Sequence, residues 1–312
     1  MYNFKSGQSM SVKAKTNFNK TISRKYNLKN LDNLMKTEIS VNKKMNTVDE
    51  LLINASHELR TPLNIIYGAV QLIELYMKDY EKNYSVDRIE ANVESIKRNN
   101  FRLIKVINNI LDLHKADTGI LNLNYSYVNV IEVVENVVQS VSEKVNDKRL
   151  NIIFDTDTEE KYMMIDIEAI QRVLLNIMSN AVKFSKQEGK ILVNVVVNNN
   201  SVDIFVSDTG IGIDKSYLKK IFNKFSQVDK SISRKAEGSG IGLKLSKLLV
   251  KAHGGDISVY SRINEGSTFT IKLPCSRNDN IYNLYTNKIS NFDSLKEMIN
   301  IEFADIDGVD IS

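Results

Sequence analysis

The stretch VNKKMNTVDELLINASHELRTPLNIIYGAVQLIELYM, residues 41–77, decides the fold of the first part of this chain. Its apolar residues recur in steps of four and three, a heptad pattern that predicts a long helix with one buried seam. A second consecutive step of four, from Leu59 to Leu63, lies beside Pro62, where a kink or local unwinding is predicted. The seam residues are Val41, Met45, Val48, Leu52, Ala55, Leu59, Leu63, Ile66, Val70, Ile73 and Met77.

A second helical pattern follows a polar break at residues 82–85. Its apolar stripe consists of Ile89, Val93, Ile96, Leu103, Ile107 and Ile110, with Asn100 in register. Two long helices joined by a short loop form an antiparallel hairpin. One hairpin has little core of its own, whereas two hairpins can bury their seams together in a four-helix bundle. The pattern therefore predicts a homodimer.

The pattern changes after residue 119 to short strands mixed with helices. Strands are predicted at Asn151–Asp155, Lys190–Val197, Val202–Val206, Asp256–Tyr260 and Thr268–Leu273, and helices at 129–146, 166–184 and 241–253. This mixture predicts an α/β sandwich with helices on one face. Beyond Pro274, which ends the last strand, a short helix is predicted at Phe292–Phe303. The fold class is therefore α+β, with a helical bundle before the α/β domain.

The bulk composition is that of a globular protein, because 42% of the 312 residues are apolar and 26% are charged. The single cysteine, Cys275, excludes a disulfide framework and fits a reducing cytosol. No apolar run approaches the roughly 18 residues of a membrane-spanning helix, and no secretory signal opens the chain. The sequence predicts a soluble, cytoplasmic protein.

The net charge of +4 is unevenly distributed. Residues 1–30 contain basic side chains and no acidic ones, whereas residues 291–312 carry six Asp or Glu against one Lys. A basic arm can contact anionic lipid or nucleic acid, or mimic a transit peptide, but its Asn, Ser and Lys content favours a solvated, poorly ordered terminus. We expect no nucleic-acid binding and at most weak peripheral membrane contact.

The run Ser56–Pro62 places a histidine on the outer side of the first helix. His57 lies between the seam positions Ala55 and Leu59, so it faces solvent, and Thr61 follows one turn later on the same face. A solvent-facing imidazole can accept a phosphoryl group while a neighbouring carboxylate, here Glu58, takes the ring proton. Thr61 could orient a water for the reverse hydrolysis. A His-Glu-x-x-His zinc site is excluded, because Thr61 occupies the fifth position.

Two separated segments carry the side chains of a candidate nucleotide pocket. Asn176 and Asn180, at i and i+4, share one helix face where their carbonyl oxygens can help to hold Mg²⁺, and Lys183 can reach phosphate from the next turn. Asp208 ends a predicted strand and can accept a hydrogen bond from the adenine amine. The glycines that follow it, Gly210 and Gly212, allow close backbone approach.

A third segment is a glycine-rich turn that leads into a predicted helix. Free N–H groups and the helix dipole at such a turn favour phosphate binding. The spacing is neither that of a Walker A loop nor that of a dinucleotide-binding fingerprint. Its residues are Gly238, Ser239, Gly240, Ile241, Gly242 and Leu243.

In content and order these segments resemble the transmitter core of sensor histidine kinases, over residues 46–274. Ser56–Pro62 is similar to the H box, Asn176–Lys183 to the N box and Asp208–Gly212 to the G1 box, all in this order along the chain. Ile221–Phe225 resembles the F box and Gly238–Gly242 the G2 box. Two closing segments of the family also have counterparts, at residues 253–255 and 265–269.

The resemblance implies a dimeric bundle with a phosphoacceptor histidine, followed by an ATP-binding domain of the GHKL type. It assigns His57 as the phosphoacceptor, Glu58 as its acid/base partner and Thr61 as the residue that assists a phosphatase reaction. Asn180 would be the main Mg²⁺ ligand with support from Asn176, and Asp208 would bind adenine. The remaining residues expected around ATP are Lys183, Gly210, Gly212, Gly238, Gly240, Gly242 and Leu243.

Four regions follow from this assignment. They are a basic arm at 1–40, a dimerisation and phosphotransfer hairpin at 41–118, an ATP-binding domain at 119–275 and an acidic tail of unknown role at 276–312. Residues 214–240 would form a mobile lid over ATP, because their composition is polar and rich in Lys and Ser. No receiver, HAMP-like or sensor domain is evident in the sequence given.

One departure from the family pattern follows Phe225, where many relatives have an arginine that contacts the γ-phosphate. Here the segment is Ser226-Gln227-Val228-Asp229, and Lys224 or Arg234 are the candidates to replace that cation. The predicted activity is ATP-dependent autophosphorylation of His57 and transfer to an aspartate of a separate response regulator. Two alternatives stay open: a dimeric nucleotide-binding scaffold without transferase activity, and another GHKL ATPase such as a chaperone or topoisomerase. The upstream H-box hairpin disfavours the second alternative.

The other two histidines are interpreted as structural. His114 is expected at the surface or at a cap near the end of the second helix, and His253 at a helix C-terminus, where a cation is favoured.

Overall fold

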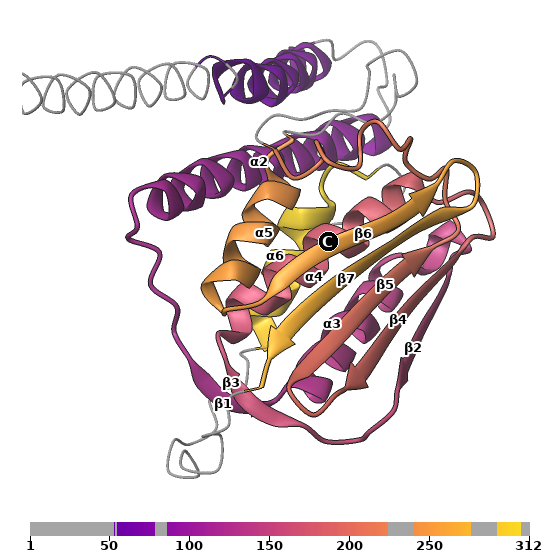
Figure 1. The fold of residues 1–312 in the computed structure, drawn as a ribbon. Helices are drawn as coiled ribbons and strands as arrows, with labels where there is room; N and C mark the ends of the chain where they lie inside the picture. Colours follow the sequence, from indigo (N-terminus) through magenta and orange to yellow (C-terminus); the bar gives the residue numbers. More distant parts are fainter. Residues whose placement is uncertain (1–52, 54, 79–85, 224–239, 276–291, 307–312) are drawn as a thin grey trace, which may run out of the picture. The chain divides into compact units, whose positions relative to one another are not determined.

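The computed structural model describes residues 53, 55–78, 86–223, 240–275 and 292–306 (Figure 1). The basic arm, the loop between the two long helices, most of the predicted lid and the chain on either side of the last helix lie outside these described residues. Within them, no helix is long and apolar enough to cross a membrane.

The first long helix covers residues 55–78 and continues through Pro62 without a break in the helical assignment. Its buried residues are Ala55, Pro62 and Ala69, at intervals of seven. The kink or unwinding predicted beside Pro62 does not interrupt the helix, and within the single chain the buried residues keep the regular heptad spacing. Of the residues assigned to the seam after Leu59, Ile66 and Ile73 are partly buried in the single chain, whereas Leu63 and Met77 are exposed at 56% and 63%.

The second long helix, α2, covers Val86–Asp117 and ends where the Thr118 N–H donates to the carbonyl of His114 (3.0 Å). Its buried residues lie on a different side from the predicted apolar stripe. They are Asn99, Val106, Asn109, Asp112 and Leu113, whereas Val93 and Ile107 of the stripe are exposed. The hydrophobic stripe predicted the second helix correctly. It did not predict which face of that helix is buried within this chain.

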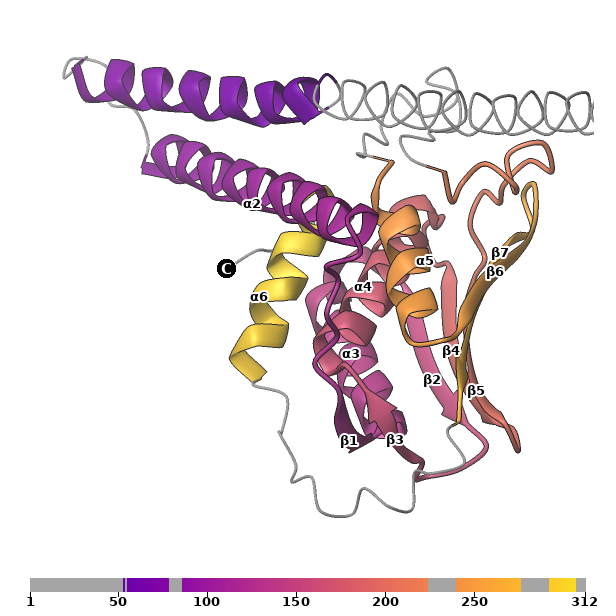
Figure 2. The ribbon, with the colours of Figure 1, turned by 60° about the vertical axis from the view of Figure 1, so that its left-hand side comes forward.

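The remaining elements form a sheet with helices on one side, as Figure 2 shows. Five strands lie in the order β2-β4-β5-β7-β6, and β2 pairs in parallel with β4 while the other pairs are antiparallel. Their bounds are β2 Asn151–Thr156, β4 Lys190–Val197, β5 Ser201–Asp208, β6 Asp256–Arg262 and β7 Gly266–Pro274. The helices on this face are α3 Val130–Lys144, α4 Ile167–Phe184 and α5 Gly242–Ala252. This architecture confirms the α+β prediction.

A small antiparallel ribbon lies at the beginning of α3 and α4. It pairs β1, Ser126–Asn129, with β3, Tyr162–Ile165, and each strand leads into a helix. The sequence analysis did not predict these strands, because a run of four residues is too short for a clear alternation. A short 3₁₀ turn at Asn146–Lys148 separates α3 from β2.

The last helix, α6, covers Phe292–Phe303, as the apolar spacing predicted. Leu295, Ile299 and Phe303 are buried and belong to the same hydrophobic core as the sheet and α4. Lys144 Nζ on α3 donates to Asn300 Oδ1 (2.7 Å). The helix in the acidic tail is thus an integral part of the α/β domain.

Candidate functional site

The N-terminus of α4, the helix that carries Asn176 and Asn180, is fixed by a capping residue, Asp166. Asp166 caps the helix by accepting from the Ala169 N–H through Oδ1 (3.0 Å), and its Oδ2 accepts from the Asn124 N–H (2.7 Å). The apolar face of α4 is buried, whereas Asn176, Asn180 and Lys183 remain partly exposed. These three predicted site residues therefore share one face of a rigid helix.

In both amide side chains of α4, Asn176 and Asn180, the nitrogen atom makes a hydrogen bond within the protein. Asn176 Nδ2 donates to Ser246 Oγ on α5 (2.8 Å), and Asn180 Nδ2 donates to the carbonyl of Asn176 (2.8 Å). Each amide thus uses its nitrogen within the protein and keeps Oδ1 as a potential ligand. Mg²⁺ prefers oxygen ligands, so the donor set fits a magnesium ion.

The glycine-rich turn reaches this face through Gly242, the first residue of α5. A Cβ added to Gly242 would lie 2.1 Å from Asn176 Oδ1, so a side chain here would collide with the amide. The N-cap residue Ile241 makes no side-chain capping bond, which leaves the helix N-terminus without a competing acceptor from that side chain. The end of the predicted turn and the first of the two predicted amides, Asn176, are therefore brought into direct contact.

Asp208 lies at the end of β5, where its Oδ1 accepts from the Gly210 N–H (2.8 Å). Burial raises the pKa of Asp208 above its ordinary value, and hydrogen bonds from the backbone of Gly210 and Ser267 partly oppose that rise. The Ile211 N–H donates to the Phe184 carbonyl (3.2 Å), so this loop is attached to the end of α4. Asp208 and the α4 amides are consequently held by one framework.

The loop after Asp208 is held further by Ser261, whose Oγ accepts from the Ile213 N–H (2.8 Å). Phe222 packs against the hydrophobic core, and Lys247 Nζ lies 4.8 Å from its ring centre. Gly240 has a left-handed backbone, with φ +63°. Gly238, Phe225, Lys224 and Arg234 lie outside the described residues, as does most of the expected lid.

His57 is exposed on the helix at 55–78, as predicted, and Thr61 is exposed on the same helix. Glu58 is half-buried. An exposed imidazole is accessible to a phosphoryl donor, which is the first requirement for an acceptor residue. His114 is also exposed, as expected for a surface residue.

His253 is the C-cap residue of α5, but it is not a cation there. Its Nε2 accepts from the Asp166 N–H (3.0 Å), while Nδ1 lies 2.8 Å from the Leu249 carbonyl. Only the neutral tautomer with a proton on Nδ1 satisfies both contacts. Burial lowers the pKa of His253, although the hydrogen bond to Leu249 and the charge of Asp166 act in the opposite direction. The expectation of a favourable cation is therefore wrong.

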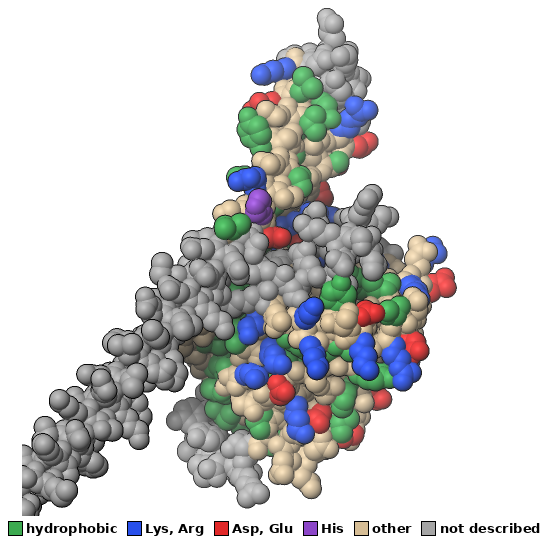
Figure 3. Space-filling model, turned by 45° about the horizontal axis from the view of Figure 1, so that its top comes forward, with side chains coloured by type: hydrophobic (Ala, Val, Ile, Leu, Met, Phe, Trp, Pro, Cys, Tyr) green, Lys and Arg blue, Asp and Glu red, His purple; other side chains and the backbone are tan. Residues whose placement is uncertain are grey.

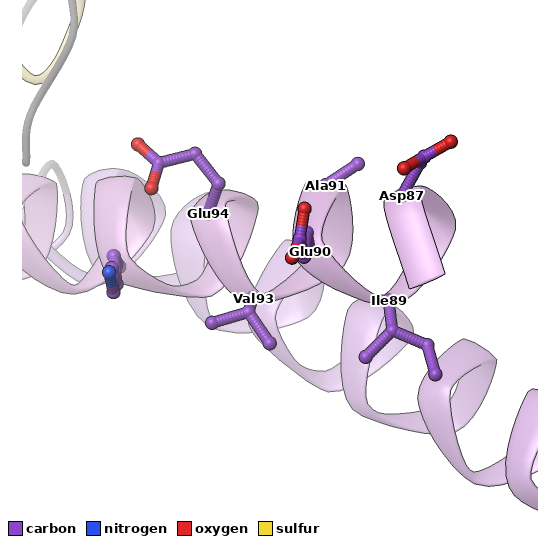
Figure 4. Close-up of a pocket in the computed structure, with 7 residues that line it drawn as sticks. Asp87, Ile89, Glu90, Ala91, Val93 and Glu94 are labelled. Atoms are coloured by element: carbon purple, nitrogen blue, oxygen red, sulfur yellow. The ribbon is translucent and has the colours of Figure 1, made fainter. Parts of the chain in front are cut away.

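The structure has a groove that contains none of the predicted site residues and a smaller cavity that contains two of them. A groove of about 500 Å³ follows the first turns of α2, and all its lining residues come from that one helix (Figure 4). Figure 4 shows Asp87, Glu90 and Glu94 with Ile89 and Val93, none of which is a predicted site residue. A smaller cavity, about 100 Å³, is lined by residues of α2, α4, α5 and α6 and includes Asn176, Gly242 and Ser246.

Basic side chains are common on the face shown in Figure 3, where they gather in a band across the described residues. The chain contains exposed lysines in the loop after β5, at Lys215, Lys219 and Lys220, and partly exposed ones on α5, at Lys244 and Lys247. A positive surface near the glycine turn favours a polyanionic ligand such as a nucleotide.

Sequence reasoning missed several side chains that hold the site. Ser246 is buried and fixes Asn176, Ser261 positions the loop after Asp208, and Glu302 accepts from Ser179 Oγ on α4 (3.1 Å). Ser246 could have been found, because it lies one helical turn after Gly242 on α5. Nothing in the local sequence indicates the contact of Glu302, because its partners are distant along the chain.

Comparison with known proteins defines the class of both parts of the chain. Residues 47–119 match the family model of the His Kinase A (phospho-acceptor) domain, and residues 165–277 match that of the histidine kinase-, DNA gyrase B- and HSP90-like ATPase. The solved histidine kinase AdeS of Acinetobacter baumannii has a TM-score of 0.54 at 22% identity, over 71% of this chain and 98% of that chain. The last comparison shows a shared fold.

Curated relatives agree with this class. The hybrid signal transduction histidine kinase D of Dictyostelium discoideum is 35% identical over 248 residues, or 77% of this chain and 16% of that protein. The sensor histidine kinase WalK of Bacillus subtilis is 32% identical over 228 residues, or 72% of this chain and 36% of WalK. The chain thus spans a minor part of the length of both relatives.

The chain therefore belongs to the sensor histidine kinases and carries both the phosphoacceptor domain and the ATPase domain. The resemblance inferred from the motifs is confirmed, and the ATPase domain supports binding of ATP.

Proposed function

We propose that this chain is a protein-histidine kinase that transfers the γ-phosphoryl group of ATP to His57. One imidazole nitrogen attacks the γ-phosphorus, the bond to the β–γ bridging oxygen breaks, and ADP leaves. Glu58 accepts the proton that the imidazole ring releases. The phosphoryl group then passes to an aspartate of a separate response regulator, and Thr61 supports the reverse hydrolysis.

The observation that carries this proposal is the contact between two distant motifs of the ATPase domain. Asn176 on α4 faces Gly242 at the start of α5 so closely that an added Cβ would displace the amide oxygen. The contact aligns amide oxygens, suited to Mg²⁺, with a helix N-terminus, suited to phosphates. We assign Asn180 as the main Mg²⁺ ligand with support from Asn176, Lys183 as a phosphate ligand and Asp208 as the acceptor for the adenine amine.

The bound metal would neutralise charge that develops on the transferred phosphoryl group. The protein itself positions the nucleotide, through Gly210, Gly212, Gly240, Gly242 and Leu243 beside the residues named above, with Gly238 as a further candidate outside the described residues. Use of ATP as the donor supports a cytoplasmic location for these two domains.

A homodimer is part of the proposal, because each HisKA-type hairpin leaves apolar side chains without cover. On the helix at 55–78, exposed apolar residues are Leu63, Ile65, Tyr67, Val70, Leu72, Leu75 and Met77. Clustered exposed apolar residues of this kind mark an interaction surface. A second copy of the same hairpin would cover them in a four-helix bundle.

A nucleotide-binding scaffold without transferase activity is the second candidate. The family arginine after the F box is absent from the sequence, which has Ser226 at that position. The exposed His57 favours the kinase, because a scaffold has no need of an accessible imidazole with a carboxylate beside it.

The test is incubation with γ-labelled ATP and Mg²⁺, followed by acid and base treatment of the labelled protein. We expect an acid-labile, base-stable label in the wild type, loss of at least about 99% of it in His57→Gln, and unchanged ATP binding, because removal of a nucleophile abolishes the covalent step. His114→Gln is the matched control, because His114 is another exposed helical histidine. A label that persists in His57→Gln would identify a different acceptor, and bound nucleotide without any label would favour the scaffold.

A further inference from the structure

The last turn of α6 lies where the bundle helix α2 meets the ATPase domain. Three buried apolar residues, Leu295, Ile299 and Phe303, fix α6 in the core, and its contacts reach α2, α3 and α4. Figure 2 shows one end of α6 beside α2 and its length along α3 and α4. Its acidic end is therefore held at a fixed position rather than free in solvent.

That acidic end forms a cluster of charges with α2. Lys105 Nζ lies 3.2 Å from Glu302 Oε1 and 2.9 Å from Asp305 Oδ2, and it also donates to the Glu302 carbonyl (2.9 Å). Arg102 Nε donates to the Ala304 carbonyl (3.0 Å) and lies 3.6 Å from Asp305 Oδ1. Both carboxylates thus pair with cations of α2.

The cluster is sheltered from solvent, with the side chains of Lys105 and Glu302 only 15% and 17% exposed. Burial alone would lower the pKa of Lys105, but the charges of Glu302 and Asp305 outweigh burial and raise it above its ordinary value. The lysine therefore stays charged. Sheltered pairs are screened less by salt than exposed ones, so this contact can hold α2 in place.

The same two carboxylates face the polar side of α4. Glu302 Oε1 accepts from Ser179 Oγ (3.1 Å), and Ser179 lies between Asn176 and Asn180 in the sequence. Burial would raise the pKa of Asp305, but Lys105, Lys183 and Arg102 together lower it.

The space between these elements is small. The cavity that touches Asn176 and Gly242 is also lined by Lys105 of α2 and Glu302 of α6, and its volume is about 100 Å³. Pockets that hold a ligand of drug size usually have volumes of roughly 300–1,000 Å³. In this arrangement α2 and α6 restrict the space beside two residues of the proposed nucleotide site.

We propose that α6 is a nucleotide-responsive latch, in which Glu302 and Asp305 hold α2 against the ATPase domain and nucleotide phosphates weaken that hold. The inference rests on the proposed function, because it places phosphates beside Lys183. Phosphates bound beside Asn176, which lines the same cavity as Glu302, would repel the two carboxylates. Since α2 belongs to the same HisKA match as His57, its release frees the phosphoacceptor domain.

Nucleotide binding and opening of the latch affect each other equally, so a nucleotide that opens the latch must bind more tightly to the open state. The first test is therefore hydrogen–deuterium exchange of the wild-type protein with and without Mg²⁺ and a non-hydrolysable ATP analogue. We expect faster exchange in peptides from residues 98–117 and 292–303, and slower exchange around 176–183. Slower or unchanged exchange in α2 and α6, together with protection of α4, would overturn the latch.

The second test compares Glu302→Gln/Asp305→Asn with Asp293→Asn/Glu297→Gln, a matched control that removes two exposed carboxylates from the same helix. The first of these, the latch variant, changes Glu302 in the last turn of α6 and Asp305 just after it. It should bind the ATP analogue about fivefold more tightly or better, since allosteric couplings of this kind are typically 5- to 150-fold. It should also label His57 faster. Affinity equal to that of the control would contradict the latch.

Loss of both acids leaves Lys105 buried without its partners, so the folded fraction must be checked by thermal melting. A third variant adds Lys105→Met, which removes that buried charge, and it should show the same gain in affinity. The two proposals fail in different ways. A chain that never labels, but still shows the change in exchange, contradicts the kinase, whereas labelling with unchanged affinity contradicts only the latch.

Discussion

At the scale of single residues, Asn176 is held from two sides and has little freedom to rotate. Its Nδ2 donates to the buried Ser246, and its Oδ1 faces the bare Cα of Gly242. The close approach of α4 and α5 thus depends on one hydrogen bond and one absent side chain. A methyl group at Gly242 would change the position of the amide oxygen, the helix N-terminus, or both.

Gly242→Ala tests this contact. The added Cβ would lie 2.1 Å from Asn176 Oδ1, and crowding of this kind costs about 1–3 kcal/mol. We expect affinity for Mg²⁺–ATP to fall by about tenfold or more, measured by isothermal titration calorimetry. Nucleotide affinity equal to that of the wild type would show that the contact does not position the ligand.

Gly68→Ala is the control for that substitution. Gly68 lies inside the helix at 55–78, and a Cβ there meets no other atom within 4 Å. Alanine in a helix interior is favoured over glycine by about 0.5–1 kcal/mol. The control should therefore be slightly more stable than the wild type and bind nucleotide equally well.

At the scale of elements, His253 connects the end of α5 to the start of α4. The neutral ring accepts from the Asp166 N–H, and a protonated ring cannot accept. Because burial lowers the pKa of His253 in the folded state, the unfolded chain binds this proton more readily. Its contribution to stability is therefore complete above the ordinary pKa of about 6.5 and is lost as the pH falls toward the lower folded value.

The predicted pH dependence is that wild type loses stability relative to His253→Gln as the pH falls below about 6.5. Urea unfolding at a series of pH values measures the difference in free energy of unfolding. His114→Gln, at an exposed histidine, should keep the wild-type dependence. A constant difference between wild type and His253→Gln at every pH would mean that the ring does not titrate in this range.

Helices with a strong apolar periodicity were predictable from the sequence, whereas very short strands and the buried faces of the two long helices were not. The apolar spacing located α4, α5 and even α6, because each buries one regular face. The ribbon of β1 and β3 was missed because four residues carry too little pattern. The faces of the long helices that are buried within the single chain were not predicted, since both sides of each helix contain apolar residues and only packing decides between them.

At the scale of the whole molecule, the exposed apolar residues on the helix at 55–78 form the surface on which the proposed dimer rests. We expect light scattering at micromolar concentration to give a mass near twice the chain mass of 35.5 kDa. Leu63→Glu/Val70→Glu should shift the protein to the monomer, because both side chains are exposed in the single chain and a charge in a buried seam is costly. Ile263→Glu, at an exposed residue of the ATPase domain, should leave the dimer intact.

The side chains of the candidate site were predictable from the sequence, but the residues that support them were not. The side chains of α4, Asp208 and the glycine turn could be named because their spacings along the chain follow a helix, a strand end and a turn. Their supports could not, because Ser246, Ser261 and Glu302 act through contacts between elements that are distant in the sequence. The contact between α2 and α6 was unpredictable for the same reason, because these helices are also far apart in the sequence.

The position of α6 has a practical consequence for anyone who exchanges modules between kinases. The family match ends at residue 277, yet Leu295, Ile299 and Phe303 complete the hydrophobic core beyond that point. A chimera joined at the family boundary would therefore lack the helix that covers part of α3 and α4. The bare apolar surface would promote aggregation, so a graft of this domain has to extend through residue 306.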